Sequence, residues 1–588
     1  MADPALPSPG RRIDAAIALY RQGAHGPALA AVDGLLDGPA ANVDALNLAA
    51  ACALALGQPV EAERRWRQAL ALEPGHAACR DNLRILLQEQ ADALQRQGRR
   101  AEAEPRYLAA LALQPDNPEL HNNLAALYAG AGHAGPAEGH YRRALQLRPA
   151  YAEAWHNLGL LYTAQRRLPD AEVALREYVA LRPQDPEGLN SLANVCQYLH
   201  RALDAEAIYR AALALAPDNA RTLNNLGALL QREGRPREAE ESYRRAIGAD
   251  PDYPEARWNL GFLLLARGRL DEGWPWMEAR HDPALARPIA RRPRLACPQW
   301  QGEPLDGRSI VVWPEQGFGD TVQFVRYLPL LKRAGAGRVT LVCQDALLPL
   351  LAAVEGADAV VGLGQAAALP PHDAWVLLLS LPMHARTSLA TIPAALPYLA
   401  PDPARVAHWR VRLDRRLEQR LAQDGDAANV LRVGLVWRGF GGHVNDANRS
   451  LPGLACLAPL WRVPGVRFAS LQRGMEPAAG AGAGEALPAH VADLGADIAD
   501  FGDTAAIVAA LDLVICVDTA VAHVAGALGK PCWVLLPAVH PDWRWMEERR
   551  DSPWYPGVLR LYRQTRPGDW EAVMRQVAAD LAAWVGAR

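Results

Sequence analysis

The segment Val517–Pro531 contains an expected helix start that could bind an anion. It follows the apolar, strand-like run Leu513–Cys516, and Asp518 or Thr519 would cap a helix that begins there. The unbonded backbone N–H groups at the start of such a helix form a ready phosphate site. His523 lies about one turn into this helix, where it either points back toward the site or serves as a packing histidine.

The loop Trp437–Ser450 carries a second set of candidate ligand-binding residues. It is polar and glycine-rich, it follows a strand-like run, and it contains Trp437, Arg438, Asn445 and Arg449. The guanidinium groups of Arg438 and Arg449 could neutralise a diphosphate, because arginine binds such groups with bidentate geometry. The alternative interpretation is a mobile surface loop.

A third segment, Trp313–Asp320, is a glycine-bearing loop between a strand-like run and a helical run. Gly317 and Gly319 allow close approach to the backbone and unusual φ values. Asp320 stands where the helix starts, and from spacing alone it is favoured as an N-cap.

The fourth segment, Pro541–Trp545, also follows a strand-like run, and Ser552–Tyr555 lies just beyond it. Its aromatic side chains could stack on a base or a sugar. The alternative is that they pack the seam between two domains.

These four segments lie where strand-like runs alternate with helical ones, a pattern typical of parallel sheets. We predict two Rossmann-like domains, at 308–404 and 429–588, joined by an interdomain linker at 405–428. Ligands of such domains bind at the carboxyl ends of the strands, so the cleft between the domains is the predicted site. The expected strands are Ser309–Trp313, Arg338–Cys343, Ala359–Val361, Trp375–Leu379, Arg432–Trp437, Val466–Ser470, Leu513–Cys516 and Cys532–Leu536. The expected helices are Thr321–Ala334, Ala346–Val354, Thr504–Ala510, Ala520–Leu528 and Trp570–Val585.

A period of 34 residues organises the N-terminal half, where a proline, an alanine and a leucine each recur five times in a fixed phase. The positions are Pro115, Pro149, Pro183, Pro217 and Pro251; Ala103, Ala137, Ala171, Ala205 and Ala239; and Leu124, Leu158, Leu192, Leu226 and Leu260. A small residue in the second helix and a closing proline are typical of tetratricopeptide repeats. We therefore predict an all-α repeat solenoid of about seven or eight helical hairpins over 1–285, followed by a linker at 286–307.

Asparagines share one phase of these repeats at Asn123, Asn157, Asn225 and Asn259, and Ser191 fills the remaining slot. In this repeat type that position often faces the groove of the solenoid, where an amide can bind a peptide backbone. The alternative is a structural polar ring. Either way, the repeats predict a protein-binding module.

Composition excludes several classes of protein. A formal net charge of −3 argues against a general nucleic-acid binder, which carries a basic patch. The eight cysteines form no C-x-x-C pair, which favours a reducing compartment over a disulfide or zinc framework. The N-terminal segment Met1–Arg12 is polar and lacks an apolar core of signal-peptide length, and no run of about 18 apolar residues exists, so we expect a cytoplasmic protein.

The G-F-G-D loop at Gly317–Asp320 and the V-D-T-x-x-x-H-x-x-x-x-x-G-K-P stretch at Val517–Pro531 together resemble heptosyltransferase-like (family 9) glycosyltransferases of GT-B architecture. The chain looks most like bacterial proteins that fuse tetratricopeptide repeats to such a domain. The resemblance covers about Gln299–Arg588 and, with the repeats, nearly the whole chain. It implies an α/β GT-B pair of Rossmann-like domains that transfers a sugar from a nucleotide-diphosphate donor with inversion. It also implies that the donor is a substrate and that neither a metal nor a cofactor is required.

The resemblance assigns roles to individual residues. It makes Asp320 the general base and lets Asp518, Thr519 and His523 cradle the donor diphosphate. Arg449 aligns with the basic residue that neutralises phosphate, although heptosyltransferases usually carry lysine there at a different spacing. Asp424-Gly-Asp426 has the D-x-D form of metal-dependent glycosyltransferases, but its alanine- and glycine-rich surroundings favour a turn.

The leading hypothesis is an inverting, metal-independent glycosyltransferase whose acceptor is a protein held in the groove of the repeats. Similar fusions modify flagellin or other surface proteins, so the resemblance points to that acceptor class. A lipid-linked or polysaccharide acceptor comes next. The rival from a different class is a repeat-based scaffold whose transferase-like domain is inactive.

Overall fold

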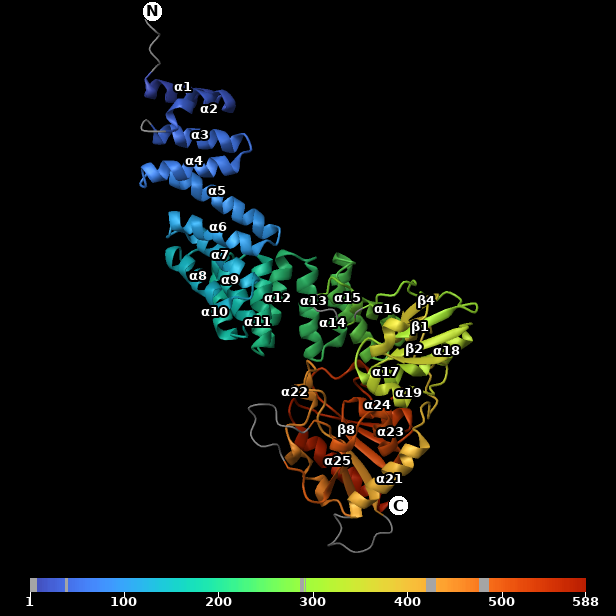
Figure 1. The fold of residues 1–588 in the computed structure, drawn as a ribbon. Helices are drawn as coiled ribbons and strands as arrows, with labels where there is room; N and C mark the ends of the chain where they lie inside the picture. The colour runs from blue at the N-terminus through green and yellow to red at the C-terminus, as the bar shows by residue number, and fades with distance from the viewer. Residues whose placement is uncertain are drawn as a thin grey trace, which may run out of the picture. The chain divides into compact units, whose positions relative to one another are not determined.

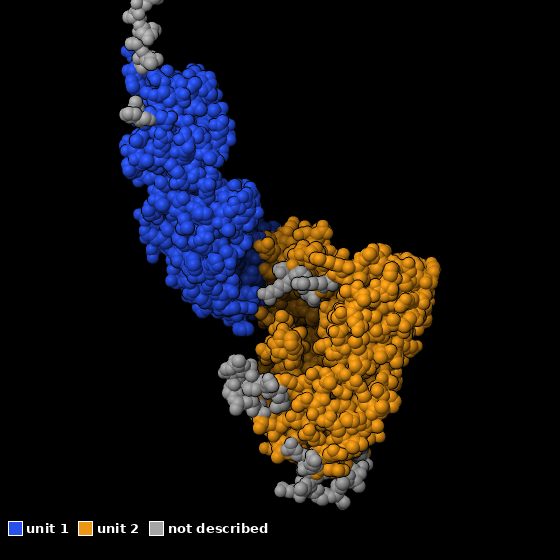
Figure 2. Space-filling model, in the orientation of Figure 1, with its two compact units in different colours: residues 1–217 blue, residues 218–588 orange. Residues whose placement is uncertain are grey.

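The computed structural model describes residues 8–37, 41–285, 290, 292–418, 430–474 and 486–587. It divides into two compact units, residues 1–217 and 218–588, which Figure 2 colours separately. This division falls inside the repeats, so the last two helical pairs share a unit with the α/β region. The domain boundaries predicted above follow changes of architecture and stay predictions.

The first unit is built from helices that pack as consecutive pairs (Figure 1). The pairs are α1 (Pro9–Arg21) with α2 (His25–Val32), α3 (Val43–Ala55) with α4 (Pro59–Leu72), α5 (Ala77–Arg96) with α6 (Arg100–Leu113), α7 (Pro118–Gly130) with α8 (Ala134–Leu147), α9 (Ala152–Ala164) with α10 (Leu168–Leu181), and α11 (Pro186–Tyr198) with α12 (Ala202–Leu215). The second unit continues with α13 (Ala220–Arg232), α14 (Pro236–Ala249), α15 (Pro254–Ala266) and α16 (Leu270–Met277), followed by the 3-10 helix η3 (Glu278–His281). The predicted solenoid is confirmed.

The recurring residues explain the pairing. Ala103, Ala137 and Ala171 are fully buried in the second helix of their pairs, where a methyl side chain lets the two helices approach closely. Tyr107 and Tyr141 are buried one turn further along and fill the seam. The last repeat carries Gly273 at the position where the other repeats carry alanine. A Cβ on Gly273 would lie only 2.7 Å from Leu265 Cδ2. In this pair the helices approach more closely than an alanine would allow.

Two parallel sheets follow the repeats. The first has the order β3-β2-β1-β4 and the second the order β10-β9-β8-β5-β6-β7, and every neighbouring pair is parallel. Their strands are β1 (Ser309–Trp313), β2 (Arg338–Cys343), β3 (Ala359–Gly362), β4 (Ala374–Leu377), β5 (Leu431–Val436), β6 (Val466–Ser470), β7 (Val491–Asp493), β8 (Leu513–Val517), β9 (Cys532–Leu536) and β10 (Leu559–Arg563). The principal helices are α17 (Phe318–Phe324), α18 (Leu328–Arg333), α19 (Leu348–Leu351), α20 (Leu381–His384), α21 (Pro403–Glu418), α22 (Asp446–Arg449), α23 (Phe501–Ala510), α24 (Ala520–Ala527) and α25 (Trp570–Gly586). The predicted α/β class with parallel sheets is confirmed.

Several predicted elements need correction. The single helix expected over Thr321–Ala334 is broken into α17, a 3-10 turn and α18, which carries Pro329 near its start, where the missing N–H breaks a continuous helix. The predicted interdomain linker at 405–428 overlaps the 16-residue helix α21, and its place as a domain boundary stays a prediction. The short edge strands β7 and β10 were not expected. The predicted turn at Asp424–Asp426 lies outside the described residues.

An aromatic seam joins the last repeat to both sheets. Trp274 from α16 lies edge-on to Trp543, with ring centroids 5.3 Å apart, and it donates from Nε1 to Thr387 O at 3.0 Å. Trp554 contacts both of these tryptophans and Phe324 of α17. Because these rings are buried, the structure supports the packing interpretation of the segment after β9 over stacking on a ligand.

No helix in the described part of the chain is both long and apolar enough to span a membrane.

The seam predicts a large effect of truncating its central ring. We expect Trp274→Ala to lower the free energy of unfolding of the second unit by about 3–5 kcal/mol, because it removes a buried aromatic side chain and leaves a cavity. Urea unfolding followed by far-UV circular dichroism measures this. Leu203→Ala is the control, since Leu203 is 82% exposed on α12. A change below about 1 kcal/mol for Trp274→Ala would show that the seam does not hold the unit together.

Candidate functional site

The predicted loops lie at the two topological switch points of the sheets. In the first sheet the strand order reverses between β1 and β4, and residues 314–317 follow β1. In the second sheet it reverses between β5 and β8, which are followed by residues 437–450 and by Asp518 and Thr519. Open parallel sheets bind ligands outside the carboxyl ends of their strands at these points.

The two switch points face each other through α17 and α24, which pack together. A Cβ on Gly319 would lie 2.7 Å from His523 Cδ2 and 3.5 Å from the Cα of Ala520. Such a contact is closer than a real Cβ tolerates, so glycine is required at position 319. The close approach predicted for this glycine is therefore made by a helix of the second sheet.

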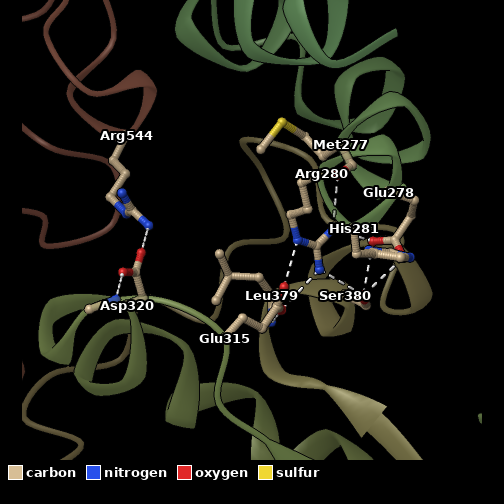
Figure 3. Close-up of polar contacts among 10 residues, drawn as sticks. Met277, Glu278, Arg280, His281, Glu315, Asp320, Leu379, Ser380 and Arg544 are labelled. Atoms are coloured by element: carbon tan, nitrogen blue, oxygen red, sulfur yellow. Dashed lines mark hydrogen bonds and ion pairs between the residues drawn. The ribbon is translucent and has the colours of Figure 1, made fainter. Parts of the chain in front are cut away.

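Asp320 is the third residue of α17 rather than its N-cap. Gly317 holds the N-cap position and donates its backbone N–H to Asp320 Oδ2 at 2.8 Å, while Asp320 Oδ1 pairs with the Arg544 guanidinium (Figure 3). Burial raises the pKa of Asp320, and the positive charge of Arg544 opposes that rise. The N-cap prediction was wrong in position, although the carboxylate does close the first turn.

Arg544 is the residue of this site that sequence reasoning missed. It lies in η11 (Trp543–Trp545) after β9, and its side chain is 7% exposed. Besides Asp320, it donates from Nε to Gln323 Oε1 and from Nη1 to Asp542 Oδ2, each at 2.6 Å. Burial lowers the pKa of Arg544, but the neighbouring carboxylates outweigh burial and raise it above its usual value. The only sequence signal was an arginine between two tryptophans in a loop beside the switch point.

The start of α24 leaves polar groups for a ligand. Thr519 holds the N-cap position, yet its side chain makes no capping bond, and Oγ1 is buried without a partner among the described residues. A buried hydroxyl without a partner is costly, so a ligand that bonds to it would be favoured. Asp518 precedes it, and burial and the charge of Asp542 raise the pKa of Asp518 to about 6, against the opposing charges of Arg449 and Arg544.

His523 has packing partners on both sides. Its Nδ1 lies 2.9 Å from the Tyr555 hydroxyl, and its ring stacks on Trp545 with centroids 5.3 Å apart. Burial, with the charges of Arg544 and Arg326, lowers the pKa of His523, so the ring is neutral at pH 7. Of the two interpretations, the structure favours the packing histidine, and direct contact with a ligand stays a prediction.

The loop after β5 separates its candidate residues. Arg449, on α22, has a side chain 13% exposed, and its charge acts on Asp518. Arg438 is exposed and donates to Pro452 O at 3.1 Å, whereas Trp437 is buried in the core of the second sheet. Asn445 donates to the carbonyl oxygens of Val539 and His540, which ties this loop to the segment after β9. Of this set, Arg449 is the one whose charge reaches the switch point.

The asparagines of the repeats form contacts between neighbouring pairs. In the first unit Asn157 donates to Asn122 Oδ1 at 3.1 Å, and in the second Asn259 donates to Asn224 Oδ1 at 2.9 Å. Both donors remain partly exposed, whereas both acceptors are buried. The asparagine side chains therefore form a ladder of hydrogen bonds between neighbouring helical pairs, and the donor amides stay partly exposed to solvent.

Comparison with known proteins supports the repeat assignment. Residues 44–279 match the family model for the C-terminal domain of cilia and flagella-associated protein 70. Protein FlbA of Caulobacter vibrioides is 31% identical over 332 residues, which cover 53% of this chain and 52% of FlbA. The chain thus spans about half the length of this curated relative.

Solved structures of other repeat proteins are also similar. A tetratricopeptide repeat protein from Parabacteroides merdae is 20% identical, with a TM-score of 0.33, and the match covers 42% of this chain and 94% of that one. YrrB, described as a TPR protein with an unusual peptide-binding site, is 20% identical with a TM-score of 0.26, covering 31% and 95%. The chain contains tetratricopeptide repeats, and these identify a protein–protein interaction module.

The raised pKa of Asp518 predicts a pH-dependent stability. Because the folded pKa of about 6 lies above the ordinary value, the ionised carboxylate destabilises the folded state above pH 6. That penalty disappears as the pH falls from 6 toward 4. We expect Asp518→Asn to stabilise the protein by about 3 kcal/mol at pH 7.5 and by about 1 kcal/mol at pH 4.5, because part of the penalty persists until the pH falls below the ordinary pKa of the carboxyl. Thermal unfolding at both pH values measures this.

The control for this experiment is Asp14→Asn, which changes an exposed carboxylate of α1 and should leave both melting temperatures unchanged. Equal effects of Asp518→Asn at the two pH values would contradict a raised pKa.

Proposed function

We propose that this protein is an inverting, metal-independent glycosyltransferase that moves a sugar from a nucleotide-activated donor to a protein recruited by the repeats. The observation that carries the proposal is the packing of α17, which bears Asp320 at one switch point, against α24, which begins at the other; Gly319, next to Asp320, lies against Ala520. A buried carboxylate thereby lies close to a helix N-terminus suited to a diphosphate.

The proposed step is a single displacement. Asp320 accepts the proton of the acceptor hydroxyl as the anomeric carbon forms a bond to that oxygen and loses its nucleotide diphosphate. Each carboxylate oxygen has two lone pairs, so Asp320 can accept this proton while it keeps its bonds to Gly317 and Arg544. Burial supports this role, since a raised pKa makes the carboxylate a stronger base.

The leaving diphosphate needs compensation for its growing negative charge. The backbone N–H groups that begin α24, the unpartnered Thr519 Oγ1 and the guanidinium of Arg449 are the groups proposed to supply it. The nucleotide and the sugar are left open by this chemistry.

The second candidate is a scaffold in which the transferase-like domain is inactive. Two observations favour it: Asp320 is paired with Arg544, and Asp518 places a negative charge near the proposed phosphate site. The tetratricopeptide repeats would then bind their protein partner without turnover.

Nucleotide binding separates these candidates. We expect one of UDP, GDP, CDP, ADP or CMP at about 100 times its dissociation constant to stabilise the full chain by roughly 2.7 kcal/mol in a thermal-shift assay. Arg449→Ala should lose the shift, and Arg438→Ala, in the same loop but directed to Pro452, should keep it. No shift with any nucleotide would favour the scaffold. Once a donor is known, Asp320→Asn should retain binding and lower transfer by about 10²–10⁴-fold.

Recruitment by the repeats makes a separate prediction. We expect Asn157→Ala to raise the KM for the protein acceptor roughly 2- to 10-fold, the equivalent of one neutral hydrogen bond, without changing hydrolysis of the donor in the absence of acceptor. Leu203→Ala, an exposed change on a second helix of a pair, is the control. Equal effects of both variants on KM would argue against groove recognition by the asparagine ladder.

A further inference from the structure

The loop between β1 and α17 carries a second buried ion pair, besides the one at Asp320. Glu315 accepts two hydrogen bonds from Arg280, from Nε at 2.7 Å and from Nη2 at 2.9 Å (Figure 3). Both side chains are 0% exposed. Glu315 also accepts the backbone N–H of Leu379 at 2.8 Å.

Arg280 belongs to η3, which ends the last tetratricopeptide repeat. Its other donors go from Nη1 to Met277 O and Glu278 Oε1 and from Nη2 to the hydroxyl of Ser380, at 2.7–3.0 Å. A guanidinium has five N–H donors, and these bonds use all of them. A lysine keeps the charge but cannot reproduce this planar set.

The position of this network is informative. Glu315 follows β1, and Leu379 and Ser380 follow β4, so the network binds the two loops that flank the switch point of the first sheet. Arg280, a residue of the repeat solenoid, thereby links the segment that follows β1 to the segment that follows β4 at this switch point. Figure 3 shows the two ion pairs on consecutive parts of the chain: Glu315 of the loop meets Arg280, and Asp320 in the first turn of α17 meets Arg544.

The remaining bonds of the loop are few. Gln344 donates from Nε2 to Gln316 O at 2.9 Å, Gly317 donates to Asp320, and Gly317 O accepts the N–H of Thr321 at 3.4 Å. Burial raises the pKa of Glu315, and the charge of Arg280 opposes this rise. Without Arg280 the Glu315 carboxylate would be buried beside Glu278 with no compensating cation, so it would have to take up a proton or move. Movement of Glu315 displaces the backbone five residues before Asp320, and protonation weakens the bond that Glu315 accepts from the Leu379 N–H, which loosens the link to the segment after β4.

We infer that Arg280 is a positioning residue: through Glu315 it holds the loop that leads into α17 and Asp320, so the last repeat is a working part of the transferase domain. The positional claim rests on the described contacts, and its catalytic consequence rests on the proposed function.

The test uses the full chain with Arg280→Lys and with Ser380→Ala, a milder change that removes one acceptor of the Arg280 guanidinium. The control is Glu272→Gln, which breaks the partly exposed Arg269–Glu272 ion pair in the same repeat. Two readouts are taken well below the melting temperature of each variant. Hydrogen exchange followed by mass spectrometry reports on the peptide that contains residues 314–324, and steady-state kinetics report on sugar transfer.

We expect Arg280→Lys to speed exchange in that peptide at least about 10-fold, with a smaller effect for Ser380→Ala and none for Glu272→Gln. We expect kcat to fall about 10- to 100-fold while KM for the donor changes little, because displacing a catalytic group by about 1 Å costs this much and the donor site lies at the other sheet. A residue that only supports folding would lower the melting temperature and leave kcat at low temperature unchanged.

The outcomes separate the two claims. Unchanged exchange in Arg280→Lys overturns the positioning role whether or not the protein is an enzyme. Faster exchange with unchanged kcat overturns its catalytic consequence. Faster exchange in a chain whose wild type neither binds nucleotide nor turns over supports the anchoring of the loop and overturns the proposed function.

Discussion

Charge buried in a protein interior must be compensated by an opposite charge or by hydrogen bonds, and in the second unit three arginines that link separate parts of the chain meet this constraint. Arg280 joins the last repeat to Glu315 of the first sheet, and Arg544 joins the second sheet to Asp320 of the first. Arg326, from the turn after α17, donates to Trp554 O and to the Tyr398 hydroxyl. None of these pairs can form until the elements have packed, so the pairing favours one arrangement of repeat and sheets.

Packing and charge act together in this seam. The tryptophans from α16 and from the segments after β9 exclude water, which strengthens each ion pair and makes its loss more damaging. Gly319 lets α17 and α24 pack closely, and this contact places the residue before Asp320 against Ala520, the first residue of α24. The proposed chemistry therefore depends on Gly319 for the close packing of α17 against α24. It also depends on Arg280 and Arg544 for the positions of Glu315 and Asp320. The repeats contribute a protein-binding surface and also an arginine of this seam.

Sequence patterns predicted the fold well where the signal was local and repeated. The 34-residue period located the helical pairs, and β1, β2, β6 and β9 have the predicted bounds. Edge strands β7 and β10 were missed, because β7 has only three residues and β10 alternates apolar residues with arginines instead of forming a continuous apolar run. The break in the helix after Thr321 depends on Pro329 and on packing, and α21 is amphipathic over a stretch that its polar composition disguised. The alternation of apolar runs therefore predicts the fold class better than it predicts the residues at which each helix and strand begins and ends.

The sequence by itself determined the solenoid, the two parallel sheets and the loops at their switch points, because hydrophobic periodicity and glycine or proline placement are local properties of the chain. Only the tertiary structure decided which residues meet. Arg544 is 224 residues from Asp320, and Arg280 is 35 residues from Glu315, so no spacing rule connects them. It also decided that His523 and the tryptophans after β9 are buried and that Arg438 is exposed. Burial and ion pairing depend on distances between elements, and those distances exist only after the repeats and sheets have packed.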